Sequence, residues 1–298
     1  MDFLKGEIMA VDKPYRMSSF GALAHVRYVM SKRLGKKVKI GHAGTLDPLA
    51  TGLLVVFVGR ATRAVEFAEA DRKEYIAGLR LGMSTDTQDI TGGIISEGSD
   101  LPVEPEVRKA LERFKGELEQ IPPMYSAVKI GGKKLYELAR KGKSIERKPR
   151  HITVFGLEIT GRSDDDYILD VVCSKGTYIR TLCNDIGMSL GCGGCMSSLR
   201  RIKSGVFSVE DAHTIAEVQE AADRGEADKL LLPIDTLFAG YPELRVDADS
   251  EKKLKNGNNI VTSAPDGRFR VYSEIGEFLL LGDVDAGKLK TVKNFFGV

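Results

Sequence analysis

The twelve residues GHAGTLDPLATG, from Gly41 to Gly52, bring three glycines, a histidine and an Asp-Pro pair into one short stretch. The apolar run LLVVFV, Leu53 to Val58, follows directly and is typical of a buried strand. The preceding segment, Val26 to Ile40, carries six Lys or Arg and no Asp or Glu. The stretch therefore predicts a rigid turn between a basic helix and a buried strand.

Asp47 and His42 each admit two interpretations. Asp47-Pro48 suits the start of a helix, because aspartate favours the N-cap and proline the first helical position. The alternative is a carboxylate that a rigid loop presents at the edge of a strand. His42 is either a hydrogen-bonded structural residue or part of a site, and the residues alone leave both questions open.

Hydrophobic periodicity predicts the other elements. A strand at 7–11 ends at Lys13-Pro14, and Ser18 or Ser19 caps a helix with an apolar stripe from Leu23 to Leu34. Asp164 to Asp166 is expected to form a solvated turn. Further strands are expected at Lys73–Leu81, His151–Thr160 and Tyr167–Cys173, and further helices at Glu104–Leu118, Thr181–Leu190 and Thr214–Arg224.

The order of these elements predicts the fold class and the domains. Strands and helices mix without regular βαβ alternation, which favours an α+β fold. A length of 298 residues suggests about two domains. Pro233 to Pro242 is interpreted as a linker, and short strands at Arg268–Tyr272 and Glu277–Leu281 predict a small all-β module. We expect domains at residues 1–240 and 241–298.

Composition excludes several classes of protein. With 42% hydrophobic and 29% charged residues, the chain is typical of soluble globular proteins rather than disordered ones. No apolar run approaches the ~18 residues of a membrane span. The N-terminus, MDFLKGEIMAVDKP, lacks the layout of a secretory signal, which predicts a cytoplasmic location.

No metal or cofactor site is indicated. Four cysteines are too few for a disulfide scaffold, and the C-x-x-C at Cys192 and Cys195 lacks the second ligand pair of a zinc site. Asp86 and Asp89 lack the spacing of a calcium loop, and no phosphate-binding or dinucleotide-binding glycine motif occurs.

Charge is weakly informative overall and more informative locally. The net charge is only +2. However, Lys129 to Arg150 contains nine Lys or Arg against two Glu. A surface of this kind can bind phosphates, and a merely solvated surface is the alternative.

The stretch GHAGTLDPLATGLLVVFVGRATR closely resembles the signature of the TruB family of tRNA pseudouridine synthases. Further blocks follow in the family's order, and in the tail KNGNNI and LLLGDV resemble a PUA domain, an RNA-binding β module. The blocks are VDKP with MSS (Val11 to Ser19), KEY (Lys73 to Tyr75), LGMSTDTQD (Leu81 to Asp89), IPPMYSAVKIGGKKLYELARKG (Ile121 to Gly142), CSKGTYIRTL (Cys173 to Leu182) and LRR (Leu199 to Arg201).

The resemblance implies a pseudouridine synthase fold with a mixed, mainly antiparallel sheet, followed by a PUA-like domain. It implies isomerisation of uridine 55 in the tRNA T loop without metal or cofactor. Asp47 is then the catalytic aspartate and Arg180 its ion-pair partner. If residues 176–180 are extended, Tyr178 and Arg180 share one face and both face the site. For Arg180 the alternative is a surface helix position.

The resemblance assigns further residues to the substrate. Tyr75 matches a tyrosine that stacks on the uracil and relays a proton, although alternation alone would make it a core residue. Tyr178 and Leu199 match positions around the flipped base, and for Leu199 the alternative is simple core packing. His42 matches a histidine that helps hold the T loop in its flipped arrangement.

The expected partner is the T stem-loop of tRNA, recognised mainly by its shape. The basic segment Lys129 to Arg150 matches a segment that closes over the RNA, with Tyr136 and Leu138 anchoring its short helix. We expect a monomer that needs no protein partner. The alternatives are an RNA-folding helper without catalysis and the related guide-RNA-dependent synthase of a multi-protein particle.

Overall fold

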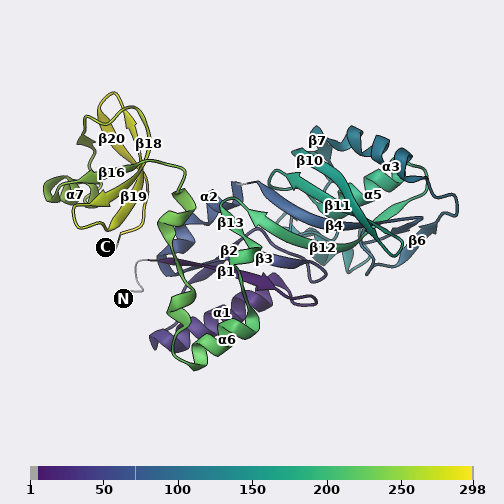
Figure 1. Cartoon of the computed structure of the whole chain (residues 1–298), viewed down its shortest axis with the longest axis horizontal. Coiled ribbons are helices and arrows are strands. Elements are labelled where there is room, and N and C mark those ends of the chain that lie inside the picture. The colour runs from purple at the N-terminus through teal and green to yellow at the C-terminus, as the bar shows by residue number, and fades with distance from the viewer. Residues whose placement is uncertain (1–5, 71, 297–298) are drawn as a thin grey trace.

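The computed structural model describes residues 6–70 and 72–296, so the first five residues of the N-terminal stretch lie outside it. Its main sheet is drawn in Figure 1. The central order is β14 (His213–Thr214), β1 (Glu7–Lys13), β3 (Thr51–Val58), β12 (Gly194–Ser204), β4 (Lys73–Leu81), β11 (Asp166–Cys173), β10 (Arg150–Ser163) and β7 (Gly116–Gln120). Three short strands pair with members of this sheet: β13 (Phe207–Ser208) with β12, β15 (Leu232–Pro233) with β1, and β2 (Ile40–Ala43) with β3.

The sheet is mixed and mainly antiparallel, which confirms the predicted α+β class. Within the described residues, β1 runs parallel to β14 and β3 parallel to β12. The long neighbours β4, β11 and β10 are antiparallel, with Val171 opposite Tyr75. β4 has the predicted bounds because its alternate side chains Tyr75, Ala77 and Leu79 are buried in one core.

One face of the sheet around β1 and β3 is covered by α1 (Ser19–Leu34) and α6 (Ile215–Asp223). α1 begins as predicted, because the Ser18 hydroxyl accepts the Gly21 N–H at 3.0 Å. It ends at Gly35, whose φ of 64° suits glycine. The buried residues shared by these elements include Met9, Val11, Val26, Met30, Leu54, Val56 and Val218.

A second core lies under α5 (Ile179–Ser189) and α3 (Glu104–Leu111), at the far end of the sheet in Figure 1. It joins these helices to β4, β10 and β11 and extends to the loop that carries Asp47. Its members include Leu46, Leu49, Tyr75, Val107, Leu111, Leu157, Leu169, Leu182 and Ile186.

The predicted helix over Glu104–Leu118 is wrong in its second half. α3 ends at Leu111, a single turn of 3-10 helix covers Glu112–Phe114, and Gly116 has φ of 90°. The chain then continues as β7, which pairs with β10 so that Gln120 lies opposite Arg150. Residues 116–120 form a strand because they pair with β10, some thirty residues away along the chain. Local periodicity does not reveal such a pairing.

The aspartate turn between β10 and β11 is only partly solvated. Asp164 adopts φ of 51°, as a tight turn requires. Asp166, however, accepts a hydrogen bond from the Arg80 Nε of β4, so this carboxylate joins neighbouring strands.

A second sheet follows in the order β16 (Glu243–Val246), β18 (Gly267–Ser273), β19 (Phe278–Asp285), β20 (Lys288–Asn294) and β17 (Ile260–Val261). The two expected strands are present as β18 and β19. The sheet also carries a helix that the sequence analysis missed, α7 (Ala248–Lys255), which Asp247 caps by accepting the Ser250 N–H at 2.7 Å.

The stretch expected to be a linker is packed instead. Ile234–Phe238 forms a 3-10 helix, and Ile234, Leu237 and Phe238 are buried. The Phe238 ring lies 5.4 Å from that of Phe67, 6.0 Å from that of Phe278 and 5.6 Å from that of Phe295, centroid to centroid. These rings join the second sheet to the first, so the segment is part of the structure between them.

Phe238→Ala is expected to lower the free energy of unfolding by about 3–5 kcal/mol, because it removes a buried ring from a packed cluster. Urea unfolding of the full chain measures the loss. Phe155→Ala is the control, since that ring is 44% exposed. A loss below about 1 kcal/mol for Phe238→Ala would contradict the packing described.

None of the helices in the described chain is long and apolar enough to cross a membrane. The remaining elements are short. They are α2 (Val65–Ala70), β5 (Met83–Thr85), β6 (Ile94–Glu97), β8 (Lys129–Ile130), β9 (Lys133–Lys134), α4 (Leu135–Ala139) and 3-10 turns at Gly59–Ala64, Val209–Asp211 and Ala227–Leu230.

Candidate active site

The loop that presents Asp47 is held by residues distant in sequence. The buried Ser19 hydroxyl accepts the Leu46 N–H and donates to the Leu46 carbonyl, each at 2.8 Å. The Arg16 N–H donates to the Pro48 carbonyl at 2.9 Å. No helix begins at Pro48, so Asp47 is not a helix cap, and the loop interpretation of this aspartate is the one that the structure supports.

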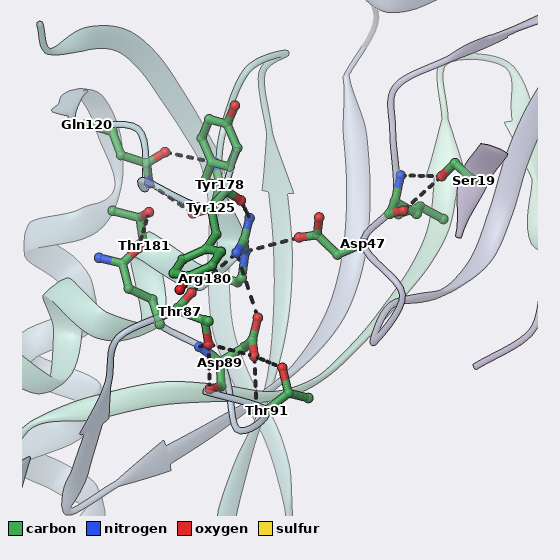
Figure 2. Close-up of polar contacts among 12 residues, drawn as sticks. Ser19, Asp47, Thr87, Asp89, Thr91, Gln120, Tyr125, Tyr178, Arg180 and Thr181 are labelled. Carbon is green, nitrogen blue, oxygen red and sulfur yellow. Dashed lines mark hydrogen bonds and ion pairs between the residues drawn. The ribbon is translucent and has the colours of Figure 1, made fainter. Parts of the chain in front are cut away.

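Arg180 is the centre of the site, as Figure 2 shows. Its side chain is 5% exposed, and its Nε lies 3.0 Å from Asp47 Oδ2. Nη1 lies 3.7 Å from Asp89 Oδ2 and donates to the Thr87 carbonyl at 3.3 Å. Nη2 donates to the Tyr125 carbonyl at 2.9 Å. A guanidinium with these partners has one orientation, so the Asp47 carboxylate is held at a defined place.

Asp89 is a residue that the sequence analysis set aside with the calcium motif and that belongs to this network. It is 5% exposed, and its Oδ1 accepts from the Thr87 hydroxyl at 3.0 Å and from the Thr91 N–H at 3.0 Å. Its place in the block LGMSTDTQD was the available signal. Asp89 is therefore a second carboxylate beside Arg180, and it is more deeply buried than Asp47.

Burial raises the pKa of Asp47 above its ordinary value, and the charge of Asp89 adds to the rise. Arg180 and, more weakly, Lys13 act in the opposite direction. Lys13 was not predicted as a site residue. Its ammonium is fully buried and donates to the Met17 carbonyl at 2.6 Å, and burial lowers its pKa to about 8.

The predicted residues Asp47, Tyr75, Tyr178, Arg180 and Leu199 all line one cavity of about 890 Å³. The structure therefore brings together five of the six side chains singled out from the sequence. The wall also contains further polar and aromatic residues, among them Tyr15, Arg16, Lys73, Thr87, Asp89, Tyr125, Ser126, Tyr136, Arg140 and Arg201.

Tyr75 lies on β4 opposite Arg201 of β12. Burial raises the pKa of its hydroxyl, against the effect of the Arg201 guanidinium, so the phenol is neutral near pH 7. Arg201 is 1% exposed and donates from Nε to the Leu53 carbonyl at 2.7 Å and from Nη2 to the Gly44 carbonyl at 3.0 Å. Arg201 thus joins the Asp47 loop to β3 and β12, a role that only the fold reveals.

Residues 176–180 are not extended, contrary to the condition considered above. Tyr178 precedes the first turn of α5, and Arg180 lies within that turn. Both nevertheless reach the cavity, because the start of the helix points at it. Leu199 lies on β12, where its carbonyl accepts from the Thr51 hydroxyl at 3.3 Å.

His42 is not part of the cavity wall. It lies half-buried on β2 opposite Val56, and its Nδ1 has no hydrogen-bond partner among the described residues. Burial lowers its pKa, and the charge of Arg201 adds to this effect. This nitrogen is itself buried, so it does not face the cavity or the solvent in this structure.

The basic segment begins after β7 and includes the β8–β9 pair and α4. Leu135 is its fully buried anchor, whereas Tyr136 and Leu138, predicted to anchor it, are half-buried. Tyr136 and Arg140 line the cavity, and the Arg140 guanidinium lies 5.5 Å from the centre of the Tyr136 ring. The segment therefore contributes a cation and an aromatic ring to the cavity that Asp47 also lines.

No three His, Cys, Asp or Glu side chains among residues 6–70 and 72–296 form a group that would hold a metal ion. Cys173, Cys183, Cys192 and Cys195 are buried free thiols. The side chains that line the cavity supply carboxylates, guanidinium groups, an ammonium group, hydroxyls and phenols.

Three family models match successive parts of the chain. "TruB family pseudouridylate synthase (N terminal domain)" matches residues 32–179. "tRNA pseudouridylate synthase B C-terminal domain" matches residues 180–239, and "Pseudouridine synthase II TruB, C-terminal" matches residues 242–292.

Curated relatives and solved structures agree with these matches. tRNA pseudouridine synthase B of Clostridium kluyveri is 40% identical over 97% of this chain and 99% of its own length. The tRNA pseudouridine synthase B of Alkaliphilus oremlandii is 44% identical over 86% of this chain and 83% of its own length. Two solved structures share the fold. One is of an H/ACA RNP bound to a substrate RNA containing 2′-deoxyuridine (22% identity), and the other is of a Cbf5–Nop10–Gar1 complex (24% identity). In each, the matching chain has a TM-score of 0.71, and the match covers 99% of this chain and 86% of the other. The chain therefore belongs to the TruB family of pseudouridylate synthases.

Proposed function

We propose that the protein isomerises uridine 55 in the T loop of tRNA to pseudouridine, with Asp47 as the catalytic carboxylate. The observation that carries this proposal is the Asp47–Arg180 ion pair at 3.0 Å on the wall of a cavity that Tyr75 also lines. Relatives of similar length that are at least 40% identical are named tRNA pseudouridine synthase B, which supports the same substrate.

The reaction breaks the N1–C1′ bond, turns the uracil and joins C5 to C1′. C5 loses its proton and N1 gains one. Nothing is added to or lost from the nucleotide as a whole. The carboxylate must be ionised to act, and the Arg180 guanidinium favours that form against the effect of burial. Arg180 also keeps Asp47 in one orientation. Less conformational entropy is then lost in reaching the transition state.

The aromatic and apolar wall receives the base. In the proposal the Tyr75 ring stacks on the uracil, and its neutral hydroxyl relays the C5 proton. Tyr178 and Leu199 border the same space. Extruding the target uridine from the T loop costs a few kcal/mol of stacking, which contacts in the cavity offset.

RNA contacts outside the cavity fall to three parts of the chain. The basic segment, with Arg140 at the cavity, binds phosphates. In the proposal His42, half-buried on β2, helps hold the flipped T loop. Residues 241–298 form a PUA-like RNA-binding domain that follows a catalytic domain of residues 1–240.

We include in the proposal that the isolated protein is active as a cytoplasmic monomer. The test is purified protein with an unmodified tRNA transcript, mapped chemically for pseudouridine, beside a transcript with cytidine at position 55. Pseudouridine at position 55 alone is expected. Tight binding without pseudouridine would favour a folding helper, and a need for guide RNA and added proteins would favour the guide-dependent class.

The pH dependence of turnover is expected to report Asp47. Since only the carboxylate acts, the single-turnover rate falls as the pH drops through its pKa, and this fall begins above the range of an ordinary aspartate. Asp89→Asn removes a charge that raises this pKa, so the fall should move to lower pH. Asp86→Asn is the control, because Asp86 is not among the charges that shift Asp47. A shift to higher pH in Asp89→Asn would contradict the assignment.

A further inference from the structure

Gln120 closes two hydrogen bonds with the backbone of a single distant residue, as Figure 2 shows. Its Oε1 accepts the Tyr178 N–H at 2.8 Å, and its Nε2 donates to the Tyr178 carbonyl at 3.0 Å. The side chain is at the end of β7 and the residue is 4% exposed. Because an N–H only donates and a carbonyl only accepts, these partners also define the orientation of the amide.

This pair of bonds engages both backbone groups of the residue that precedes α5. Tyr178 precedes α5 without a side-chain cap, and its N–H lies outside the helical hydrogen-bond pattern. A primary amide of this length is suited to satisfy both backbone groups at once. A carboxylate would accept from the N–H but could not donate to the carbonyl, and an apolar chain would do neither. The carbonyl also accepts the Leu182 N–H at 3.0 Å, so the N–H is the group that depends on Gln120.

The contact determines where the cavity wall lies. Tyr178 lines the cavity, and Arg180, two residues further, holds Asp47. Five residues after Gln120, the chain contacts α5 again. There the Tyr125 carbonyl accepts a hydrogen bond from Arg180 Nη2 at 2.9 Å. The start of the basic segment and the start of α5 are thus joined at two points.

We propose that Gln120 is a positioning residue for the isomerisation: by holding the backbone of Tyr178 it sets the place of the Tyr178 ring in the wall that receives the target base. This inference rests on the proposed function. Gln120 does not line the cavity, so it acts through Tyr178 rather than by touching RNA.

The test is Gln120→Met, which keeps the length of the side chain and removes both hydrogen bonds. The single-turnover rate on a T stem-loop RNA should fall about 10-fold to 100-fold, and the Kd for that RNA should change less than threefold. Gln120→Glu, which keeps the acceptor for the Tyr178 N–H, should lie between wild type and Gln120→Met. It also serves if Gln120→Met does not fold. Gln219→Met is the matched control, since this half-buried glutamine donates a hydrogen bond to Asp223 on the same helix and does not line the cavity.

A double-mutant cycle separates positioning from general loss of stability. In a Tyr178→Ala background, Gln120→Met should reduce the rate less than threefold, because the ring that it positions is gone. An equal loss in both backgrounds would overturn the proposal, as would wild-type rates in Gln120→Met and Gln120→Glu. A wild type that forms no pseudouridine would instead remove the proposed function, and the inference with it.

Discussion

Asp47→Asn is expected to reduce pseudouridine formation by about ten-thousandfold and to leave the Kd for tRNA within about tenfold of wild type. Asparagine has the shape of aspartate and accepts a hydrogen bond from Arg180, but it has no charge with which to act on the sugar or base. Binding is expected to persist because contacts to phosphates provide most of the affinity for RNA. Single-turnover rates and filter binding measure the two quantities.

The matched control is Asp283→Asn. Asp283 also pairs with an arginine, at 2.8 Å from Arg268, and its side chain is 41% exposed against 40% for Asp47. It lies in the second sheet, outside the cavity, so loss of that ion pair should leave the single-turnover rate at saturating T stem-loop RNA unchanged. Parallel loss of binding and turnover in Asp47→Asn would mean that Asp47 supports the loop rather than the chemistry.

Arg180→Lys is expected to lower turnover about a thousandfold while the free energy of unfolding falls by only about 2 kcal/mol. The lysine keeps a positive charge in the site. It cannot reach Asp47, Asp89 and the two carbonyls at once, because an ammonium lacks the planar array of donors. A thousandfold loss corresponds to about 4 kcal/mol of transition-state stabilisation, more than the loss in folding.

Urea unfolding and single-turnover rates of the same preparation test this difference. Arg268→Lys is the control, because its bidentate pairing with Asp283 is similar but lies outside the cavity. Near-normal turnover in Arg180→Lys would remove the guanidinium from the mechanism. Turnover that falls only in step with stability would make Arg180 a structural residue.

Sequence patterns predicted those helices and strands whose signals, an alternation of apolar residues or a capping residue, lie within the element itself. The strand Lys73–Leu81 and the Ser18-capped helix were predictable because their periodicity and cap lie within a few residues. A rigid turn around Asp47 was predicted, but the residues that hold it were not, because Ser19 and Arg201 approach the loop only through the fold. The change from helix to strand at Gly116 likewise depends on pairing with β10.

The site was predicted through motifs rather than through geometry. Resemblance selected Asp47, Tyr75, Tyr178, Arg180 and Leu199, which the fold gathers in one cavity. Asp89, Lys13 and Gln120 escaped selection because no periodicity or spacing marks them, although Asp89 and Lys13 lie within blocks that match the family. Their roles come from burial beside a charge or from hydrogen bonds to a distant backbone. His42 was selected and lies outside the cavity, a difference that only the three-dimensional structure reveals.

The most direct test of the central claim is tritium release from a T stem-loop RNA labelled at uridine C5, with wild type and Asp47→Asn measured side by side in EDTA. The Asp47–Arg180 account predicts stoichiometric release at the target uridine by the wild type and none above background by Asp47→Asn at equal RNA occupancy. Release by Asp47→Asn at a rate near that of wild type would contradict it.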